Sequence, residues 1–379
     1  MLFTNEQLYE RIQSDKAEMV VSFLFKNSLI SSQSHVHRLA PDTRSITEES
    51  YSHTRERESL IIKPFPEENN LGISGIDLRF GRLVAWTDTV RQNATKDDLL
   101  GFPHKVLEPG EEFVMEHDPE GNKVYYVTSF ESVSIPSSLE ILIDSKSTTG
   151  RVGGMSHEVG YDNKTGEIIK LIQLYSFPLK VTCGKTSLSQ AVIRYKGSKY
   201  LETEKILSGD FVAFEEDGQS IKENITPRGL SMNFSTDLIY RARKCDIPVD
   251  MDARGTIDPK DYWERIEGNS KVTLDAKTLY LFGSLGKIKL GAVCGLLSRE
   301  EQVLTGTGTW GHFAGIFQPF WKGGVTMEVY GFSKREICRG DRAGIVIFDE
   351  IEVEGGRTYE GSYQNQRPPM LPKMFSELR

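Results

Sequence analysis

The chain repeats itself, and this internal repeat constrains the fold more than any other feature of the sequence. Four segments of the first half have counterparts in the second half, in the same order along the chain. The pairs are 72–78 with 229–235, 127–146 with 281–299, 170–184 with 326–340, and 195–200 with 359–364. One such match carries little weight, but four in register predict two copies of one structural unit.

Each copy is built from short runs of β-type residues. The runs in the first copy include KVYYVTSF, SLEILI, EIIKLIQLYSF, LKVTC, QAVIRY and DFVAF, separated by Gly, Pro, Asp and Asn turns. This texture is typical of an all-β barrel or sandwich. We therefore expect a mainly β protein with one unit over 66–225 and a second over 226–379. Residues 1–65 are predicted to form an extension, with a helix within 5–30 followed by an arm or loop.

Charge and composition exclude several classes of protein. The formal net charge of −8 argues against a nonspecific nucleic-acid or membrane-surface binder, because those proteins need a broad basic field. The four cysteines, Cys183, Cys245, Cys294 and Cys338, stand far apart, so no CxxC pair suggests a zinc or redox motif. The sequence has neither a signal-peptide pattern nor an apolar run of about 18 residues, so we expect a cytoplasmic protein.

The run DSKSTTGRVGG at 144–154 follows an apolar strand pattern in the first copy. It presents hydroxyls, backbone N–H groups and two cations within one short reach, which suits phosphate oxygens. It is not a Walker loop, because GxxxxGK[ST] is absent. A polar turn with solvated charges is the alternative interpretation of the run taken alone.

The two copies have complementary losses. In the second copy Glu300 and Leu304 stand where the first has Ser147 and Arg151, so the hydroxyl and the cation are gone. In the strand GGVTMEVYGF, alternation places Val325, Met327 and Val329 on one face and Thr326, Glu328 and Tyr330 on the other. The first copy has Gln173 at the position of Glu328, and an amide is no general base. One copy thus keeps the serine and arginine, and the other keeps the carboxylate.

These residues resemble the dCTP deaminase branch of the dUTPase-like enzymes. The resemblance rests on Lys146-Ser147-Thr148-Thr149-Gly150-Arg151, on the strand Gly324–Tyr330, and on a C-terminal segment with Tyr359, Tyr363 and Gln366; Asp77 and Arg79 are a weaker match. It covers most of residues 70–379 and implies two β-clip or distorted β-barrel units. In that family each pocket forms between neighbouring subunits of a trimer. We therefore expect a homotrimer, with sites either within one chain or between chains.

The resemblance implies hydrolytic deamination of dCTP to dUTP and ammonia, which feeds dUMP and dTTP synthesis. Glu328 would act as the general base, with Ser147 and Arg151 completing the catalytic site. The substrate-binding residues would be Lys146, Thr148, Thr149, Gly150, Gln318, Thr326, Met327, Tyr359, Tyr363 and Gln366. Magnesium would arrive bound to the triphosphate. Zinc is not expected, because the H-x-E and P-C-x-x-C elements of zinc deaminases are absent.

Three departures from the family pattern keep other functions open. Gln318 stands where the family has an aspartate, and Ser362 stands where it has a lysine. The positive charge of that lysine is then missing, unless Arg367 or Lys373 supplies it. The third departure is Gly150, because glycine at this position is also found in bifunctional enzymes and dUTPases. The enzyme alternative is therefore a deaminase that further hydrolyses dUTP to dUMP, or a dUTPase. An inactive nucleotide-binding protein is the alternative of another class.

Overall fold

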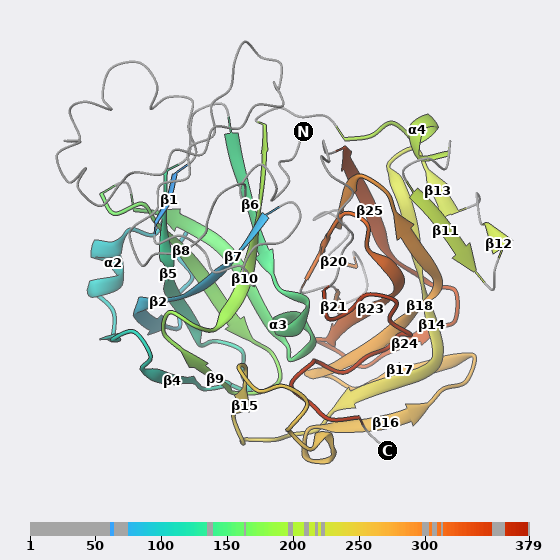
Figure 1. Cartoon of the computed structure of the whole chain (residues 1–379). Coiled ribbons are helices and arrows are strands. Elements are labelled where there is room, and N and C mark those ends of the chain that lie inside the picture. The colour runs from blue at the N-terminus through green and yellow to red at the C-terminus, as the bar shows by residue number, and fades with distance from the viewer. Residues whose placement is uncertain are drawn as a thin grey trace, which may run out of the picture.

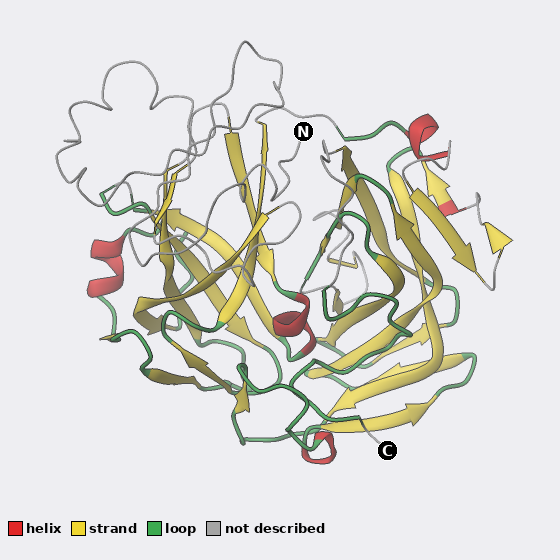
Figure 2. Cartoon of the chain, viewed as in Figure 1, coloured by secondary structure: helices red, strands yellow, loops and turns green. Residues whose placement is uncertain are grey.

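The computed structural model shows a mainly β protein in which strands dominate and helices are short (Figure 2). The residues that it describes are 61–63, 75–134, 139–162, 164–195, 200–207, 212–216, 219–220, 224–297, 303–304, 309–311, 314–350 and 361–377. The helix expected within 5–30 and the side chain of Tyr359 lie outside these residues. No helix in the described part of the chain is both long and apolar enough to cross a membrane.

The first copy forms one curled sheet with the strand order β6-β10-β2-β5-β8-β7 (Figure 1). Its strands are β2 (Gly75–Thr87), β5 (Val124–Ser134), β6 (Leu139–Ser145), β7 (Gly154–Tyr161), β8 (Glu167–Leu174) and β10 (Ser187–Tyr195), with β1 (Ile61–Lys63) beside β5 and β3 (His104–Val106) beside β2. Helix α2 (Lys96–Leu100) lies at the edge of this unit. The β-type runs predicted from the sequence are strands here.

The second copy forms a sheet with the order β20-β21-β23-β18-β14-β25-β19-β22. Its strands are β14 (Gly229–Ala242), β18 (Thr278–Leu290), β19 (Val293–Leu297), β20 (Val303–Leu304), β21 (Thr309–Gly311), β22 (Ile316–Phe317), β23 (Lys322–Gly331) and β25 (Arg342–Glu350), with β11 (Val212–Glu216), β12 (Gln219–Ser220), β13 (Ile225–Thr226) and β16 (Trp263–Glu267) attached. The order β19-β25-β14-β18-β23-β21 repeats that of the first sheet, strand for strand.

The boundary between the copies lies earlier than the sequence suggested. Strand β11, assigned to the first unit, pairs with β18 of the second sheet through Val212 and Leu290. Ile206 of the short helix α4 (Thr203–Leu207) is buried in the core of the second unit. Strand pairing and burial therefore place α4 and β11 with the second copy, where β11 also pairs with β12.

A small three-stranded sheet joins the two copies. Strand β15 (Val249–Asp250), from an excursion between β14 and β16, runs parallel to β9 (Leu179–Thr182) of the first copy, which also pairs with β4 (Glu112–Met115). The excursion includes the 3₁₀ turn η5 (Pro259–Asp261). A second small sheet pairs β17 (Lys271–Leu274) with β24 (Arg335–Cys338).

One hydrophobic core continues from the interior of the first copy into the second. Phe177 and Leu179 of the first copy pack with Trp263 of the second, and the rings of Phe177 and Trp263 are 5.3 Å apart. Tyr175 and Tyr330, at equivalent places in the two copies, approach to 4.9 Å between ring centroids. Apolar burial on this scale fixes the two sheets relative to each other.

Candidate active site

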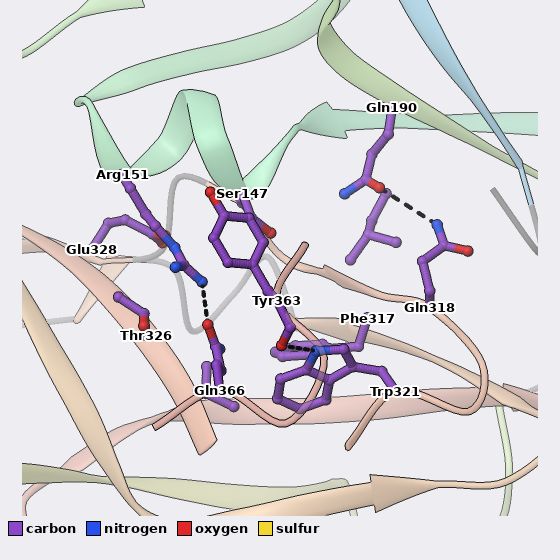
Figure 3. A pocket seen from close by; sticks show the side chains of 13 residues that line it. Ser147, Arg151, Gln190, Phe317, Gln318, Trp321, Thr326, Glu328, Tyr363 and Gln366 are labelled. Atoms are coloured by element: carbon purple, nitrogen blue, oxygen red, sulfur yellow. Dashed lines mark hydrogen bonds and ion pairs between the residues drawn. The ribbon is translucent and has the colours of Figure 1, made fainter. Parts of the chain in front are cut away.

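A pocket lined by polar and apolar side chains lies between the two copies (Figure 3). Both copies and the C-terminal segment contribute to its walls. The lining residues are Ser147, Arg151, Gln190, Ala314, Ile316, Phe317, Gln318, Trp321, Val325, Thr326, Glu328, Tyr363 and Gln366. All of these lining residues belong to one chain.

The serine and arginine come from a single helical turn, α3 (Ser147–Arg151), which follows β6 directly. The sequence predicted a strand running into a turn; instead the Gly150 N–H donates to the Lys146 carbonyl at 2.9 Å and closes a helical turn. The segment can pack tightly because its neighbours are small: a Cβ on Gly154 would come within 2.8 Å of Thr149. The turn aims Ser147 and Arg151 toward the second copy (Figure 3).

The guanidinium of Arg151 is almost fully buried, with 2% of the residue exposed. It donates to Gln366 Oε1 at 2.8 Å and to the Met370 carbonyl at 3.2 Å. Its Cζ atom lies 3.7 Å from the centroid of the Tyr363 ring, a cation–π geometry. These contacts hold the planar group in one orientation, with its Nε 4.0 Å from Glu328 Oε1.

Glu328 is the buried carboxylate that the repeat comparison singled out. It is 2% exposed, and its Oε2 atom has no hydrogen-bond partner among the described residues. Burial raises the pKa of Glu328 to about 8, and nearby Asp144 adds to the rise, while Arg151 and the backbone N–H of Ala314 act against it. A carboxyl with a pKa near neutrality and a free oxygen facing a cavity suits proton transfer.

Strand β23 presents its residues as alternation predicted. Met327 and Val329 belong to the core of the second unit, and Thr326 and Glu328 line the pocket. Val325 belongs to that core and also contributes to the pocket wall. Strands β18 and β21 pair with β23 on its two edges, and the Glu328 side chain projects from the face of this sheet toward Arg151 of α3.

The C-terminal segment, residues 361–377, closes one side of the pocket. Gln366 donates to the Gly324 carbonyl at 2.6 Å, and the Met370 N–H donates to Thr326 Oγ1 at 3.0 Å. The Tyr363 hydroxyl lies 3.0 Å from Thr148 Oγ1 of the first copy. The segment thus ties α3 to β23 across the boundary between the copies.

Gly324 provides a direct test of this arrangement. A Cβ at this position would come within 2.4 Å of Pro368, so Gly324→Ala is expected to displace the segment at a cost of about 1–3 kcal/mol. Hydrogen exchange should show faster exchange at Gln366 and Met370 than in the parent protein. Gly101→Ala is the matched control, because its φ of −79° suits alanine and the nearest atom to the added carbon, the Asp98 carbonyl oxygen, lies 3.3 Å away. Unchanged exchange in Gly324→Ala would contradict the contact.

Most of the residues predicted from the sequence meet at the pocket. Those that line it are Ser147, Arg151, Gln318, Thr326, Glu328, Tyr363 and Gln366. Thr148, Thr149 and Gly150 are buried in α3 behind it, and Thr149 Oγ1 has no hydrogen-bond partner in the described part of the chain.

Three predicted substrate-binding residues are placed elsewhere. The side chain of Met327 lies in the core, on the face of β23 opposite the pocket, because neighbouring residues of a strand point in opposite directions. Lys146 does not line the pocket and pairs with Asp77. Tyr359 lies outside the described residues.

The sequence comparison missed Gln190, which lines the pocket from β10 and accepts a hydrogen bond from Gln318 Nε2 at 3.5 Å (Figure 3). The available signal was a polar residue in the apolar run SLSQAVIRY. It also missed the role of Trp321, whose indole N–H donates to the Tyr363 carbonyl at 3.1 Å.

Family models match both halves of the chain. Residues 46–191 match the model described as dCTP deaminase-like, and residues 203–331 match the C-terminal domain of 2'-deoxycytidine 5'-triphosphate deaminase. The chain belongs to the dCTP deaminase family. The match to the C-terminal domain model begins at residue 203, where helix α4 of the second copy also begins.

A solved structure shares the fold of this dCTP deaminase family member. The crystal structure of 2'-deoxycytidine 5'-triphosphate deaminase from Agrobacterium tumefaciens superposes with a TM-score of 0.65 at 19% sequence identity. The match covers 78% of this chain and 94% of that one. A comparison with curated protein sequences gives no match.

Proposed function

We propose that this protein is a dCTP deaminase that hydrolyses dCTP to dUTP and ammonia in the pocket between its two copies. The observation that carries the proposal is the position of Glu328. A buried carboxyl with an unpaired oxygen faces Ser147 and Arg151 across a closed polar cavity. Family membership makes the substrate class a nucleotide with a cytosine base.

The proposed chemistry uses Glu328 as the general base. Ionised Glu328 takes a proton from a water molecule as the water oxygen bonds to C4 of cytosine. That proton passes to the ring nitrogen N3, and the proton on the new C4 hydroxyl is then carried to the amino group. The C4–N bond breaks, ammonia leaves, and the C4 carbonyl of uracil forms. Such proton transfer contributes roughly 10²–10⁴-fold to a rate.

Ser147 and Arg151 position the reactants. The Arg151 guanidinium is held by Gln366 and Tyr363 and stays in one orientation before substrate arrives, so little reorganisation is needed at the moment of reaction. Magnesium enters as the counterion of the triphosphate, and the proton transfers are assigned to this chain's own residues.

Because one chain supplies both halves of the pocket, catalysis does not require a second chain to complete the site. The homotrimer stays a prediction from the resemblance. Specific activity is expected to stay constant on dilution below the dissociation concentration of any oligomer, measured by sedimentation alongside ammonia release.

The direct test is incubation with dCTP and magnesium, with ammonia measured and dUTP and dUMP separated by chromatography. Ammonia with accumulating dUTP supports a single deaminase activity. Ammonia with dUMP supports the bifunctional alternative, which Gly150 left open. A folded protein that binds dCTP and releases no ammonia would establish the nucleotide-binding alternative instead.

The pKa of Glu328 predicts the pH dependence of catalysis. The carboxyl must be ionised to act as a base, and burial raises its pKa to about 8 in the free site. The value of kcat/KM is therefore expected to fall about tenfold per pH unit below this pKa and to level off above it. Initial rates at low dCTP concentration from pH 6 to 9 provide the measurement, and a flat profile over that range would contradict the assignment.

A further inference from the structure

Basic side chains from three distant parts of the chain gather beside the Tyr363 wall of the pocket. Lys146 directly precedes Ser147. The Lys373 N–H donates to the Tyr363 hydroxyl at 3.3 Å, so the C-terminal segment brings Lys373 to the same side. Gly255 donates to the Lys373 carbonyl at 3.0 Å, which places the neighbouring Arg254 there as well.

The positive charge of this cluster is only partly balanced. Lys146 pairs with Asp77, and Asp252 accepts from the Thr186 hydroxyl at 2.8 Å. In the described part of the chain, the Lys373 ammonium has no hydrogen-bond or ion-pair partner.

The surroundings of Lys373 disfavour its charged form. Burial lowers the pKa of Lys373 to about 8, and Lys146 and Arg254 add to the lowering, while Asp77 and Asp252 act against it. Holding an ammonium beside two other cations costs free energy that a bound anion would recover.

The side chain of Lys373 is not what anchors the segment. The anchoring bonds run from the backbone N–H groups of Gly255, Thr256 and Ile257 to the carbonyls of residues 373 and 374, and Phe375 and Met374 pack into the core. The fold therefore keeps its C-terminal segment without using the ammonium. This leaves the cation available for a ligand.

We propose that Lys373 and Arg254, with Lys146, bind the polyphosphate end of the nucleotide, and that Lys373 makes the site prefer a triphosphate to a monophosphate. The identity of the nucleotide rests on the proposed function. With the cytosine ring at Glu328, the phosphates are the only strongly anionic part of the ligand. The cluster lies next to α3, because Lys146 directly precedes this helix and the Tyr363 hydroxyl contacts both the Lys373 N–H at 3.3 Å and Thr148 Oγ1 at 3.0 Å. Ser147 of the same helix lines the pocket.

Neither Arg254 nor Lys373 belongs to the segments on which the family resemblance rests. Arg254 lies in the excursion between β14 and β16, and Lys373 follows the family-like C-terminal tyrosine and glutamine pattern. Together they supply the positive charge that Ser362 cannot. The two copies are thus complemented by a phosphate subsite that neither copy contains alone.

The experiment compares Lys373→Met and Lys373→Arg with Lys334→Met, an exposed lysine in the turn after β23 that serves as the matched control. Lys373→Met is expected to raise KM for dCTP roughly tenfold to hundredfold, since hydrogen bonds to charged groups contribute about 1.5–3 kcal/mol. The inhibition constant of dCMP, as a competitor of dCTP, should stay unchanged. Lys373→Arg should restore most of the affinity for dCTP.

A second measurement does not depend on deamination. Isothermal titration calorimetry with inorganic tripolyphosphate should detect binding to the parent protein and to Lys334→Met, and a roughly tenfold or larger loss in Lys373→Met. If the parent releases no ammonia but binds tripolyphosphate through Lys373, the subsite stands and the deaminase proposal fails. Equal weakening of dCTP and dCMP, or equal tripolyphosphate binding in all variants, would overturn the subsite.

Discussion

Glu328→Gln is expected to lower kcat for ammonia release from dCTP by roughly 10²–10⁴-fold while leaving the binding of dCTP nearly intact. The amide has almost the same shape, so the pocket keeps its form, but it cannot accept a proton near neutral pH. The measurement is ammonia release under saturating dCTP, with nucleotide binding followed by calorimetry.

Glu336→Gln is the matched control for this variant. Glu336 lies on β24 of the same copy and forms an exposed ion pair with Lys271, so its loss should leave kcat unchanged. Near-parental kcat in Glu328→Gln would remove Glu328 from the role of base. Equal losses in both variants would point to a general effect on folding.

Glu328→Gln is also expected to change how the free energy of unfolding depends on pH. The folded state keeps the Glu328 proton up to a pKa of about 8, whereas an unfolded glutamic acid loses it near 4.5. Between these values the folded state binds more protons, so its stability falls as pH rises through this window. Glu328→Gln should abolish this loss and be the more stable protein at pH 9 by a few kcal/mol. Urea unfolding at pH 5 and pH 9 provides the measurement.

Arg151→Met is expected to lower kcat roughly 10²–10³-fold, the cost typical of losing one preorganised donor in a reaction site. It should also destabilise the C-terminal segment, because Gln366 and the Met370 carbonyl lose their donor and Tyr363 loses the stacked cation. Ammonia release and hydrogen exchange over 361–377 report the two effects separately.

Two further variants complete the test of Arg151. Arg151→Lys keeps the charge but not the planar fork or the stacking, so it should recover only part of the activity. Arg265→Met removes an exposed arginine paired with Glu267 and should leave both readouts at the parental level. Full activity in Arg151→Met would contradict the positioning role.

Local patterns in the sequence predicted the fold class and the two faces of β23. Alternation alone placed Glu328 and Thr326 opposite Met327, because side chains of a strand point to opposite faces regardless of what packs on them. The same rule separates Met327 from the pocket, although the resemblance had assigned it to substrate binding. Register within a strand is local, and so the sequence determines it.

The sequence also indicated which residues belong together. Ser147 and Arg151 survive in one copy and Glu328 in the other, a pattern that only a shared site explains. It could not indicate Gln190, because a single glutamine in an apolar strand carries no motif. It placed the unit boundary too late, because turn residues mark a hairpin and a domain end alike.

The repeat, the complementary losses and the chemistry of Glu328 were determined by the sequence itself, since each depends on residue identity and short-range order. Only the tertiary structure decided that the two halves meet within one chain, that α3 is a helical turn, and that Lys373 and Arg254 come to the same place. These are contacts between residues far apart in sequence, and burial of the core between the copies sets them. The raised pKa of Glu328 follows from that burial, since the same carboxyl on an exposed strand would titrate near its usual value.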